Sequence, residues 1–381
     1  MVGAPGEQKS VILVCLTSAL VLISSCATSA PDSDQVVAGG QGTRESTGST
    51  SSILFEGESP MLLMAGSTDR HWLLTEETES TIAVKRLGEA GAEGVAVIDA
   101  PLQALDAATD SDNLFVIGVG CGDDTCGSAS AQLFRVSSSG VVDVLGEVDS
   151  HPGPPSGSDA VEIIGILEDT LFVQDMQGRL LSLDRDGTVI GEPARAHGEL
   201  CIIDSDLYQI TPDGEPSQPG TESDVAEPAT VGPTGFSIGR WAGQGFDDVP
   251  NGRLERSQSP GGAAFCMGDA FEVEGPNELK RWSPNSGWVD HSPFRWSPEA
   301  DRTGTAASST GHRYFVDAGG RLQRIEGDHS VPMALVFAIE RGEGPPLGLL
   351  VDDAGGDVVA CVHAHTAESG TGTTECSFGR S

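Results

Sequence analysis

A hairpin pattern that recurs along the chain is the feature that most constrains its fold. Two stretches align closely, the first covering residues 170–175 and 178–183 and the second covering residues 312–317 and 320–325. Each joins two short apolar runs through a turn rich in Asp and Gly, a pattern typical of a β-hairpin. Looser copies occur at residues 114–136 and 271–282, and no convincing amphipathic helix longer than two turns follows Ser52. The pattern therefore predicts an all-β repeat protein.

The spacing of the repeat indicates which all-β architecture to expect. One aromatic or apolar residue can be assigned to the second strand of each unit: Trp72, Phe115, Phe172, Tyr208, Phe271, Phe315 and Val359. These positions are on average about 48 residues apart, which is close to the length of a four-stranded propeller blade. We therefore predict a β-propeller of seven four-stranded blades. A ring of six or eight blades, or a pair of β-sandwiches, is left open by the spacing.

The two ends of the repeat region predict how the ring closes. The last unit supplies three strands, at residues 347–351, 357–363 and 374–379, where the other units supply four. An apolar segment without a partner, Ile53 to Glu56, stands upstream of the first unit. We expect this segment to be the fourth strand of the last blade, because closure removes the exposed sheet edges that favour aggregation.

One stretch departs from the regular spacing. Residues 212–261 are rich in Pro, Gly, Glu and Asp, with Trp241 and Phe246 among them. Irregular segments of this length are usually functional or disordered. The sequence predicts an insertion in the fourth unit, which is either a surface loop or a cap over one end of the channel.

The first 25 residues have the pattern of a secretory signal. A polar segment that ends at Lys9-Ser10 is followed by an apolar run from Val11 to Ile23. A membrane-spanning helix needs about 20 apolar residues, so this shorter run favours an export signal over a transmembrane anchor.

The apolar run ends in Leu22-Ile23-Ser24-Ser25-Cys26, which resembles the lipobox of bacterial lipoproteins. In that family an aliphatic residue and two small residues precede the cysteine that is lipidated, and Ile23 stands where the family more often has Leu. The resemblance implies that Cys26 carries a lipid and becomes the new N-terminus. The chain would then be held at the outer face of the cytoplasmic membrane or in the cell envelope, because two acyl chains anchor a protein stably.

The segment after Cys26 predicts a tether. Residues 27–51 are mostly Ser, Thr, Gly, Ala, Asp and Gln, without an aromatic residue. Such a segment cannot bury enough apolar surface to fold, and as a flexible coil it would span roughly 25 to 30 Å. The expected domains are thus a signal peptide at residues 1–25, a lipidated tether at residues 26–51 and a propeller at residues 52–381.

The six cysteines of the propeller region predict disulfides. An even number of cysteines in an exported chain is typical of paired thiols, although six cysteines allow 15 pairings. Cys121 and Cys126, and likewise Cys361 and Cys376, lie symmetrically about a turn between the second and third strands of their units. Cross-strand pairing would bring each couple within disulfide reach. Cys201 and Cys266, in the first strands of neighbouring units, are paired partly by elimination.

The charge of the chain excludes one class of partner. The formal net charge is −36, and a strongly acidic surface is repelled by nucleic acid. We therefore expect no nucleic-acid partner. Such acidity also fits salt adaptation or the binding of divalent cations, and the sequence does not separate these.

Sequence motifs typical of metal-binding or catalytic sites give little evidence for a function. Cys361, His363 and His365 would share one face of a strand, but Cys361 is expected in a disulfide, so we predict no metal site. Residues 184–187 and 352–357 look like calcium loops but lack the Glu that ends an EF-hand loop, so we interpret them as turns. Residues 283–288 faintly resemble the Asp-box turn of sialidase-like propellers, with Asn285 in place of Asp. That turn is structural in the family and implies no catalysis.

The sequence favours a binding function. It contains no nucleophile elbow, no phosphate-binding glycine loop and no zinc-protease helix, and the carboxylates are too numerous for any pair to stand out. We predict no cofactor and no catalytic residue. The expected function is a non-catalytic binding or scaffold module of the cell envelope that recruits a protein, peptide or glycan on a propeller face. The alternative is a propeller hydrolase or lactonase-like enzyme with its site at a mouth of the channel.

Overall fold

The computed structural model describes most of the chain from Ser52 onward. The described residues are 52–57, 59, 61–67, 70–78, 80–88, 91–122, 126–155, 161–213, 235–255, 263–274, 278–291, 305–308, 311–317, 319–326, 328–337, 348–353, 357–365 and 372–380. The predicted signal peptide, lipobox and tether lie outside them. No helix in this described part of the chain is long and apolar enough to cross a membrane.

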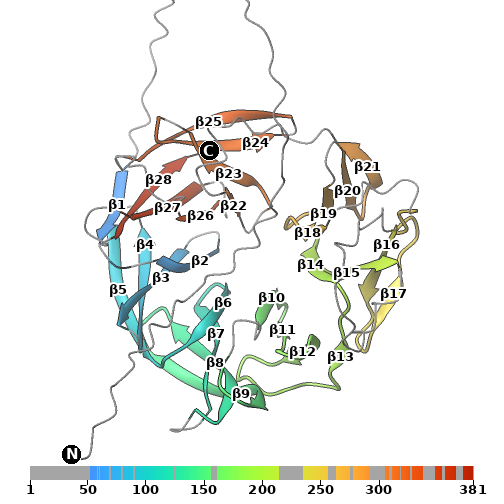
Figure 1. The fold of residues 1–381 in the computed structure, drawn as a ribbon, viewed down its shortest axis with the longest axis horizontal. Coiled ribbons are helices and arrows are strands. Elements are labelled where there is room, and N and C mark those ends of the chain that lie inside the picture. The colour runs from blue at the N-terminus through green and yellow to red at the C-terminus, as the bar shows by residue number, and fades with distance from the viewer. Residues whose placement is uncertain are drawn as a thin grey trace, which may run out of the picture.

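The described residues form 28 β-strands in seven four-stranded antiparallel sheets. The sheets are arranged as the blades of a ring, with the first strand of each sheet nearest the centre and the fourth at the perimeter (Figure 1). The fold is therefore a seven-bladed β-propeller, as the spacing of the repeat predicted.

The blades are numbered in chain order. Blade 1 contains β2 (Met61–Ser67), β3 (Arg70–Thr78), β4 (Thr81–Gly88) and β5 (Gly91–Asp99). Blade 2 contains β6 (Gln103–Thr109), β7 (Asn113–Cys121), β8 (Ser128–Ser137) and β9 (Val142–Pro152). Blade 3 contains β10 (Glu162–Leu167), β11 (Thr170–Gln174), β12 (Arg179–Leu183) and β13 (Ala194–Arg195). Blade 4 contains β14 (Glu199–Ile203), β15 (Asp206–Asp213), β16 (Gly235–Trp241) and β17 (Phe246–Asp248). Blade 5 contains β18 (Ala264–Cys266), β19 (Phe271–Glu274), β20 (Leu279–Ser283) and β21 (Gly287–His291). Blade 6 contains β22 (Thr305–Ala307), β23 (Arg313–Val316), β24 (Arg321–Glu326) and β25 (His329–Val336). Blade 7 contains β26 (Gly348–Asp352), β27 (Asp357–His365), β28 (Gly372–Arg380) and β1 (Ser52–Gly57).

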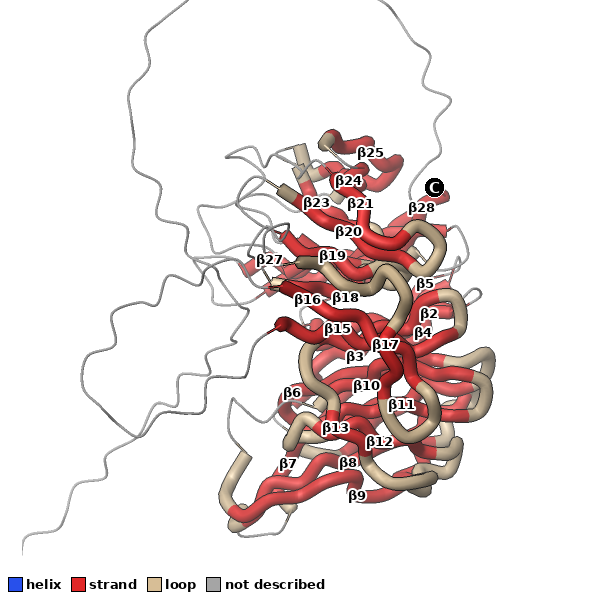
Figure 2. The backbone as a smooth tube through the Cα atoms, turned by 90° about the vertical axis from the view of Figure 1, so that its right-hand side faces the viewer, coloured by secondary structure: helices blue, strands red, loops and turns tan. Residues whose placement is uncertain are grey.

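The antiparallel order gives the ring two distinct faces. The connections from one blade to the next lie on the same face as the turns between second and third strands, and we call this the inter-blade face. The opposite face carries the turns between first and second strands and between third and fourth strands. Figure 2 shows the strands from the side, running between the two faces.

The hydrophobic core is divided into clusters between neighbouring blades. The seven residues that marked the repeat all lie in second strands, and all are buried. Trp72 of blade 1, for example, belongs to one cluster with Leu114 and Phe134 of blade 2. Each blade is too thin to bury apolar side chains by itself, so packing against its neighbours holds the ring together.

The ring is closed by the N-terminal strand. β1 pairs with β28 in antiparallel register from Ser52 opposite Phe378 to Gly57 opposite Thr374. It completes blade 7 as the fourth strand, which confirms the prediction made from Ile53 to Glu56. This pairing covers an edge of β28 that would otherwise expose unpaired backbone groups.

Part of the stretch that was predicted to be an insertion, residues 212–261, forms strands of blade 4 instead. Residues 235–255 of that stretch hold β16 and β17, the third and fourth strands of blade 4. Trp241 packs edge-on against Phe172 of blade 3 and against Phe246, with ring centroids 6.1 and 5.2 Å apart. The short run Phe246–Asp248 gave too little apolar signal to be recognised as a strand. Residues 214–234, between β15 and β16, lie outside the described residues.

Three disulfides join the six cysteines of the propeller. They connect Cys121 to Cys126, Cys201 to Cys266 and Cys361 to Cys376, which are the pairs expected from the sequence. The first spans the turn from β7 to β8, and the third joins directly opposed residues of β27 and β28. The second links the first strands of blades 4 and 5.

Candidate binding site

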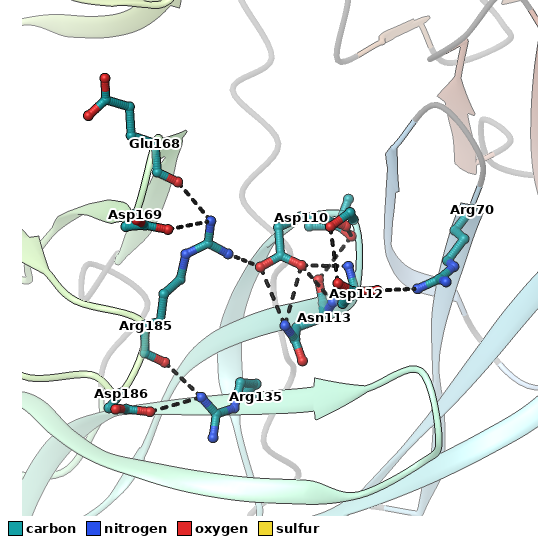
Figure 3. Close-up of polar contacts among 11 residues, drawn as sticks. Arg70, Asp110, Asp112, Asn113, Arg135, Glu168, Asp169, Arg185 and Asp186 are labelled. Carbon is teal, nitrogen blue, oxygen red and sulfur yellow. Dashed lines mark hydrogen bonds and ion pairs between the residues drawn. The ribbon is translucent and has the colours of Figure 1, made fainter.

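Basic side chains on the opposite face are held in ion pairs between blades 2 and 3 (Figure 3). Arg185 of blade 3 contacts the carboxylate of Asp110 in blade 2 and donates to the carbonyl oxygen of Glu168 at 2.7 Å. In return, Arg135 of blade 2 donates to Asp186 of blade 3 at 3.0 Å. Pairs of this kind at a surface contribute about 0 to 1 kcal/mol each. Their arrangement indicates a structural role in aligning the two blades.

Two His–Asp pairs lie side by side where blade 7 meets its neighbours on the opposite face. Asp352 accepts from Nδ1 of His71 in blade 1, and Asp353 accepts from Nδ1 of His312 in blade 6, both at 2.6 Å. The hydroxyl of Tyr314 also donates to Asp353, at 2.8 Å. Burial and this hydrogen bond raise the pKa of Tyr314. Because both Asp residues are buried, these contacts compensate the cost of removing their charges from water.

Asp352 ends β26 and Asp353 follows it, where the sequence predicted a turn, and both side chains also contact neighbouring blades. Both are buried between blades, and Gly66 leaves the room that Asp352 needs, since a Cβ atom there would lie 1.3 Å from Oδ2 of Asp352. The other segment that was interpreted as a turn, residues 184–187, forms a turn in the structure. Oδ1 of Asp184 accepts from the backbone N–H groups of Asp186 and Thr188.

Three carboxylates lie on successive inner strands: Asp106 on β6, Glu162 on β10 and Glu199 on β14. Glu162 and Glu199 are the first residues of their strands, so both stand at the inter-blade face. Oδ2 of Asp106 accepts from the backbone N–H of Ile163, the residue next to Glu162, at 2.6 Å. Within the described part of the chain, no Lys, Arg or His pairs with any of the three.

The surroundings of these carboxylates favour their neutral forms. Burial raises the pKa of Asp106 to about 6, although hydrogen bonds from two backbone N–H groups act to lower this pKa. Burial, followed by the charges of Asp106 and Glu199, raises the pKa of Glu162 to about 7. Burial also raises the pKa of Glu199. Although the Glu162 side chain is exposed to solvent, the protein around it hydrates its charge less well than bulk water does.

A groove opens beside Glu199 at the inter-blade face, between blades 4 and 5. Its volume is about 330 Å³. Apart from Glu199, the lining residues are nearly all apolar: Gly198, Ile210, Pro212, Phe236, Ala263 and Ala264. A concave, mostly apolar surface with one polar group is the usual form of a small ligand site.

The disulfide between Cys201 and Cys266 fixes the spacing of the groove walls. Cys201 follows Glu199 by two residues on β14, and Cys266 follows Ala264 by two residues on β18. Oε1 of Glu199 accepts from the backbone N–H of Cys266 at 3.4 Å, which ties the carboxylate to the opposite wall. The walls are thus covalently joined before any ligand arrives, and this lowers the entropy cost of binding.

Cys361 and His363, which suggested a metal site in the sequence, have other partners in the structure. Cys361 is bonded to Cys376, and Nδ1 of His363 lies 2.7 Å from Oγ1 of Thr374. The side chain of His365 lies outside the described residues, as does Cys26. Among the side chains that are described, no group of three or more His, Cys, Asp or Glu is placed to hold a metal ion.

The segment that resembles an Asp-box turn connects β20 and β21. Asn285 donates to Asp204 of blade 4 at 3.2 Å, and Nε1 of Trp288 donates to the carbonyl oxygen of Gly252 at 3.0 Å. Both contacts join blade 5 to blade 4. The segment is therefore structural, as the resemblance implied.

Sequence reasoning missed Asp106, Glu162 and Glu199, because carboxylates are abundant throughout the chain. One signal could have found two of them. Glu162 and Glu199 each come immediately before a short apolar inner strand, in consecutive units of the repeat. An acidic residue repeated at the start of inner strands predicts charge gathered at one mouth of the channel.

Comparison with known proteins shows no family for this chain. No family model matches the chain, and no curated protein matches it. Among solved structures, virginiamycin B lyase from Staphylococcus aureus is 11% identical, with 86% of this chain and 98% of that chain covered and a TM-score of 0.42. The β-propeller domain of the Trilobed protease from Pyrococcus furiosus is 11% identical, with 84% and 94% covered and a TM-score of 0.48. BamB from Moraxella catarrhalis is 12% identical, with 86% and 99% covered and a TM-score of 0.35. Function has to be argued from the residues of this chain.

Proposed function

We propose that this protein is an exported, lipid-anchored binding module of the cell envelope that recruits its partner on the inter-blade face. The groove between blades 4 and 5 is the observation that carries the proposal. It is lined by apolar residues and by the carboxylate of Glu199. A second carboxylate, Glu162, is close enough for Glu199 to raise its pKa.

The cysteines support the extracytoplasmic part of the proposal. All six cysteines of the propeller are paired, and disulfides persist in oxidising compartments outside the cytoplasm. The signal-like segment and the lipobox resemblance at Cys26 supply the route of export and the anchor. The domain boundaries proposed for this function are residues 1–25, 26–51 and 52–381.

Site-specific photo-crosslinking in intact cells tests which face binds. A photo-reactive phenylalanine analogue replaces His197, an exposed residue next to the groove, or Ser139, an exposed residue on the opposite face. We expect crosslinked adducts from position 197 and few from position 139, both chains being present in equal amounts. Equal adducts from both positions, or none from position 197, would contradict the proposal.

One observation favours the alternative of a hydrolase. The side chain of His312 is 49% exposed and is held through Nδ1 by the buried carboxylate of Asp353, an arrangement that orients a histidine for proton transfer. Hydrolysis of a panel of nitrophenyl esters and lactones, compared between the native chain and His312→Ala, tests this function. Turnover that is lost in the variant would support an enzyme, and turnover that is absent or equal in both would exclude His312 as its base.

A further inference from the structure

The groove between blades 4 and 5 combines an apolar interior with a single charged wall. Its volume of about 330 Å³ is at the small end of the range for ligand pockets, so it suits one side chain better than a large ligand. Ile210 and Phe236 offer an aliphatic and an aromatic surface, and Glu199 supplies the charge. The occupant that matches these surfaces has an apolar stem and a cationic end.

We propose that the groove binds a lysine side chain in a basic segment of the partner, with the stem against Ile210 and Phe236 and the ammonium at Glu199. This inference rests on the proposed function and names the chemistry of the partner. Charge complementarity supports it, because no described basic residue neutralises Glu199 and the whole chain carries a net charge of −36. A cation would replace the missing counter-charge.

The geometry of Glu199 favours lysine over arginine. Oε1 of Glu199 already accepts from the backbone N–H of Cys266. This oxygen is therefore less available to a ligand than Oε2. A guanidinium gains most from bidentate contact with two carboxylate oxygens, whereas an ammonium needs a single acceptor. The groove should therefore select the point charge of lysine.

Binding should also release protons near neutral pH. The pKa of Glu162 is raised to about 7 and that of Glu199 is raised, so a cation bound beside them should favour the loss of protons. Affinity for a lysine peptide is therefore expected to be higher at pH 8 than at pH 5. Besides burial, the charges of Asp106 and Glu199 raise the pKa of Glu162.

Calorimetry with short blocked peptides tests the inference on the full chain. The probes are acetyl-Gly-Lys-Gly-amide and the same peptide with norleucine, acetyl-lysine or arginine at the centre. We expect the lysine peptide to bind about 10-fold or more tightly than the norleucine and acetyl-lysine peptides, as one charge-assisted hydrogen bond allows. Glu199→Gln should remove that difference while keeping an acceptor for the N–H of Cys266. Glu192→Gln, at an exposed site on blade 3, is the matched control.

A second variant tests the groove without touching the charge. Ala263→Leu fills the rim and should weaken the lysine peptide while leaving the melting temperature unchanged. Equal binding of lysine and norleucine peptides, or full binding by Glu199→Gln, would overturn the inference. In that case crosslinks at position 197 would still support the proposed function, so the two failures can be told apart.

Discussion

The carboxylates on the inner strands β6, β10 and β14 show how neighbouring blades can place like charges near each other. Asp106, Glu162 and Glu199 come from blades 2, 3 and 4, whose inner strands are neighbours in the ring. Each has a pKa above its ordinary value because burial disfavours the charged form. Such groups weaken the fold when ionised, and they are retained at sites where a ligand can supply the missing cation.

The pH dependence of stability follows from these shifts. Because the folded pKa of Glu162 is about 7 and the ordinary value is 4.5, the folded state holds a proton that the unfolded state has lost between these pH values. Its contribution to stability is therefore fully present below about pH 4.5 and is lost as the pH rises through 7. Glu162→Gln should melt like the native chain at pH 5 and at a higher temperature at pH 8. Melting curves at both pH values, with Glu192→Gln as control, measure the difference. A lower melting temperature of the Gln variant at pH 8 would contradict the assignment.

Gly66 is expected to be irreplaceable for a steric reason. A Cβ atom at this position would overlap the carboxylate of Asp352 and displace it from His71. Gly66→Ala should lower the free energy of unfolding by about 2 to 4 kcal/mol, the range for overpacking combined with loss of a buried hydrogen bond. Gly88→Ala is the control, because no atom lies within 4 Å of its added Cβ. Denaturant unfolding of both variants measures the effect, and equal losses would show that Asp352 moves without cost.

Lipidation is expected to depend on Cys26 alone. This cysteine follows the apolar run at the lipobox spacing, and the propeller cysteines are in disulfides. Cys26→Ser should abolish incorporation of radiolabelled fatty acid and release the chain from the membrane fraction. Label that persists in the variant would place the anchor elsewhere.

β1 has only six residues, yet it closes the ring of blades. It is the first strand of the described residues and the outermost strand of the last blade, so it joins the two ends of the described fold. Removing it would expose the edge of β28 and leave the ring joined by packing alone between blades 7 and 1.

Two truncations test the contribution of β1. A chain that starts at Gly48 keeps the strand and should melt like the full chain. A chain that starts at Ser59 lacks the strand and should melt at a much lower temperature or aggregate through the exposed edge. Thermal melting and light scattering compare the two chains, and similar behaviour of both would refute the closure by β1.

The elements that sequence reasoning recovered are those in which local pattern and packing agree. The hairpins of β11 with β12 and of β23 with β24 were predicted to within a few residues, because apolar runs and Asp/Gly turns mark them. β17 was missed since its three residues carry one apolar side chain. The candidate site was missed for a different reason. Asp106, Glu162 and Glu199 lie on separate strands, and their charges interact only because successive blades pack side by side.

The net charge of −36 on the whole molecule destabilises the folded state. Charges of one sign repel each other across the compact state, and salt screens them over about 10 Å at 0.1 M. Raising NaCl from 10 to 500 mM at pH 8 should therefore increase the melting temperature by several degrees. The increase should disappear at pH 4.5, close to the pI of about 4.3. Calorimetric scans at the two pH values test this, and a fall in melting temperature with salt at pH 8 would show that screened ion pairs outweigh the repulsion.

The closing strand also determines how the molecule responds to a mechanical force. A tension that reaches the chain ahead of Ser52 acts first on β1, and a pull along the axis of this strand shears all of its hydrogen bonds to β28 at once. The next pair of strands in blade 7 is held more firmly, because the disulfide between Cys361 and Cys376 couples β28 covalently to β27. The propeller should thus yield in one abrupt step, by losing a single strand, while the sheet behind that strand holds.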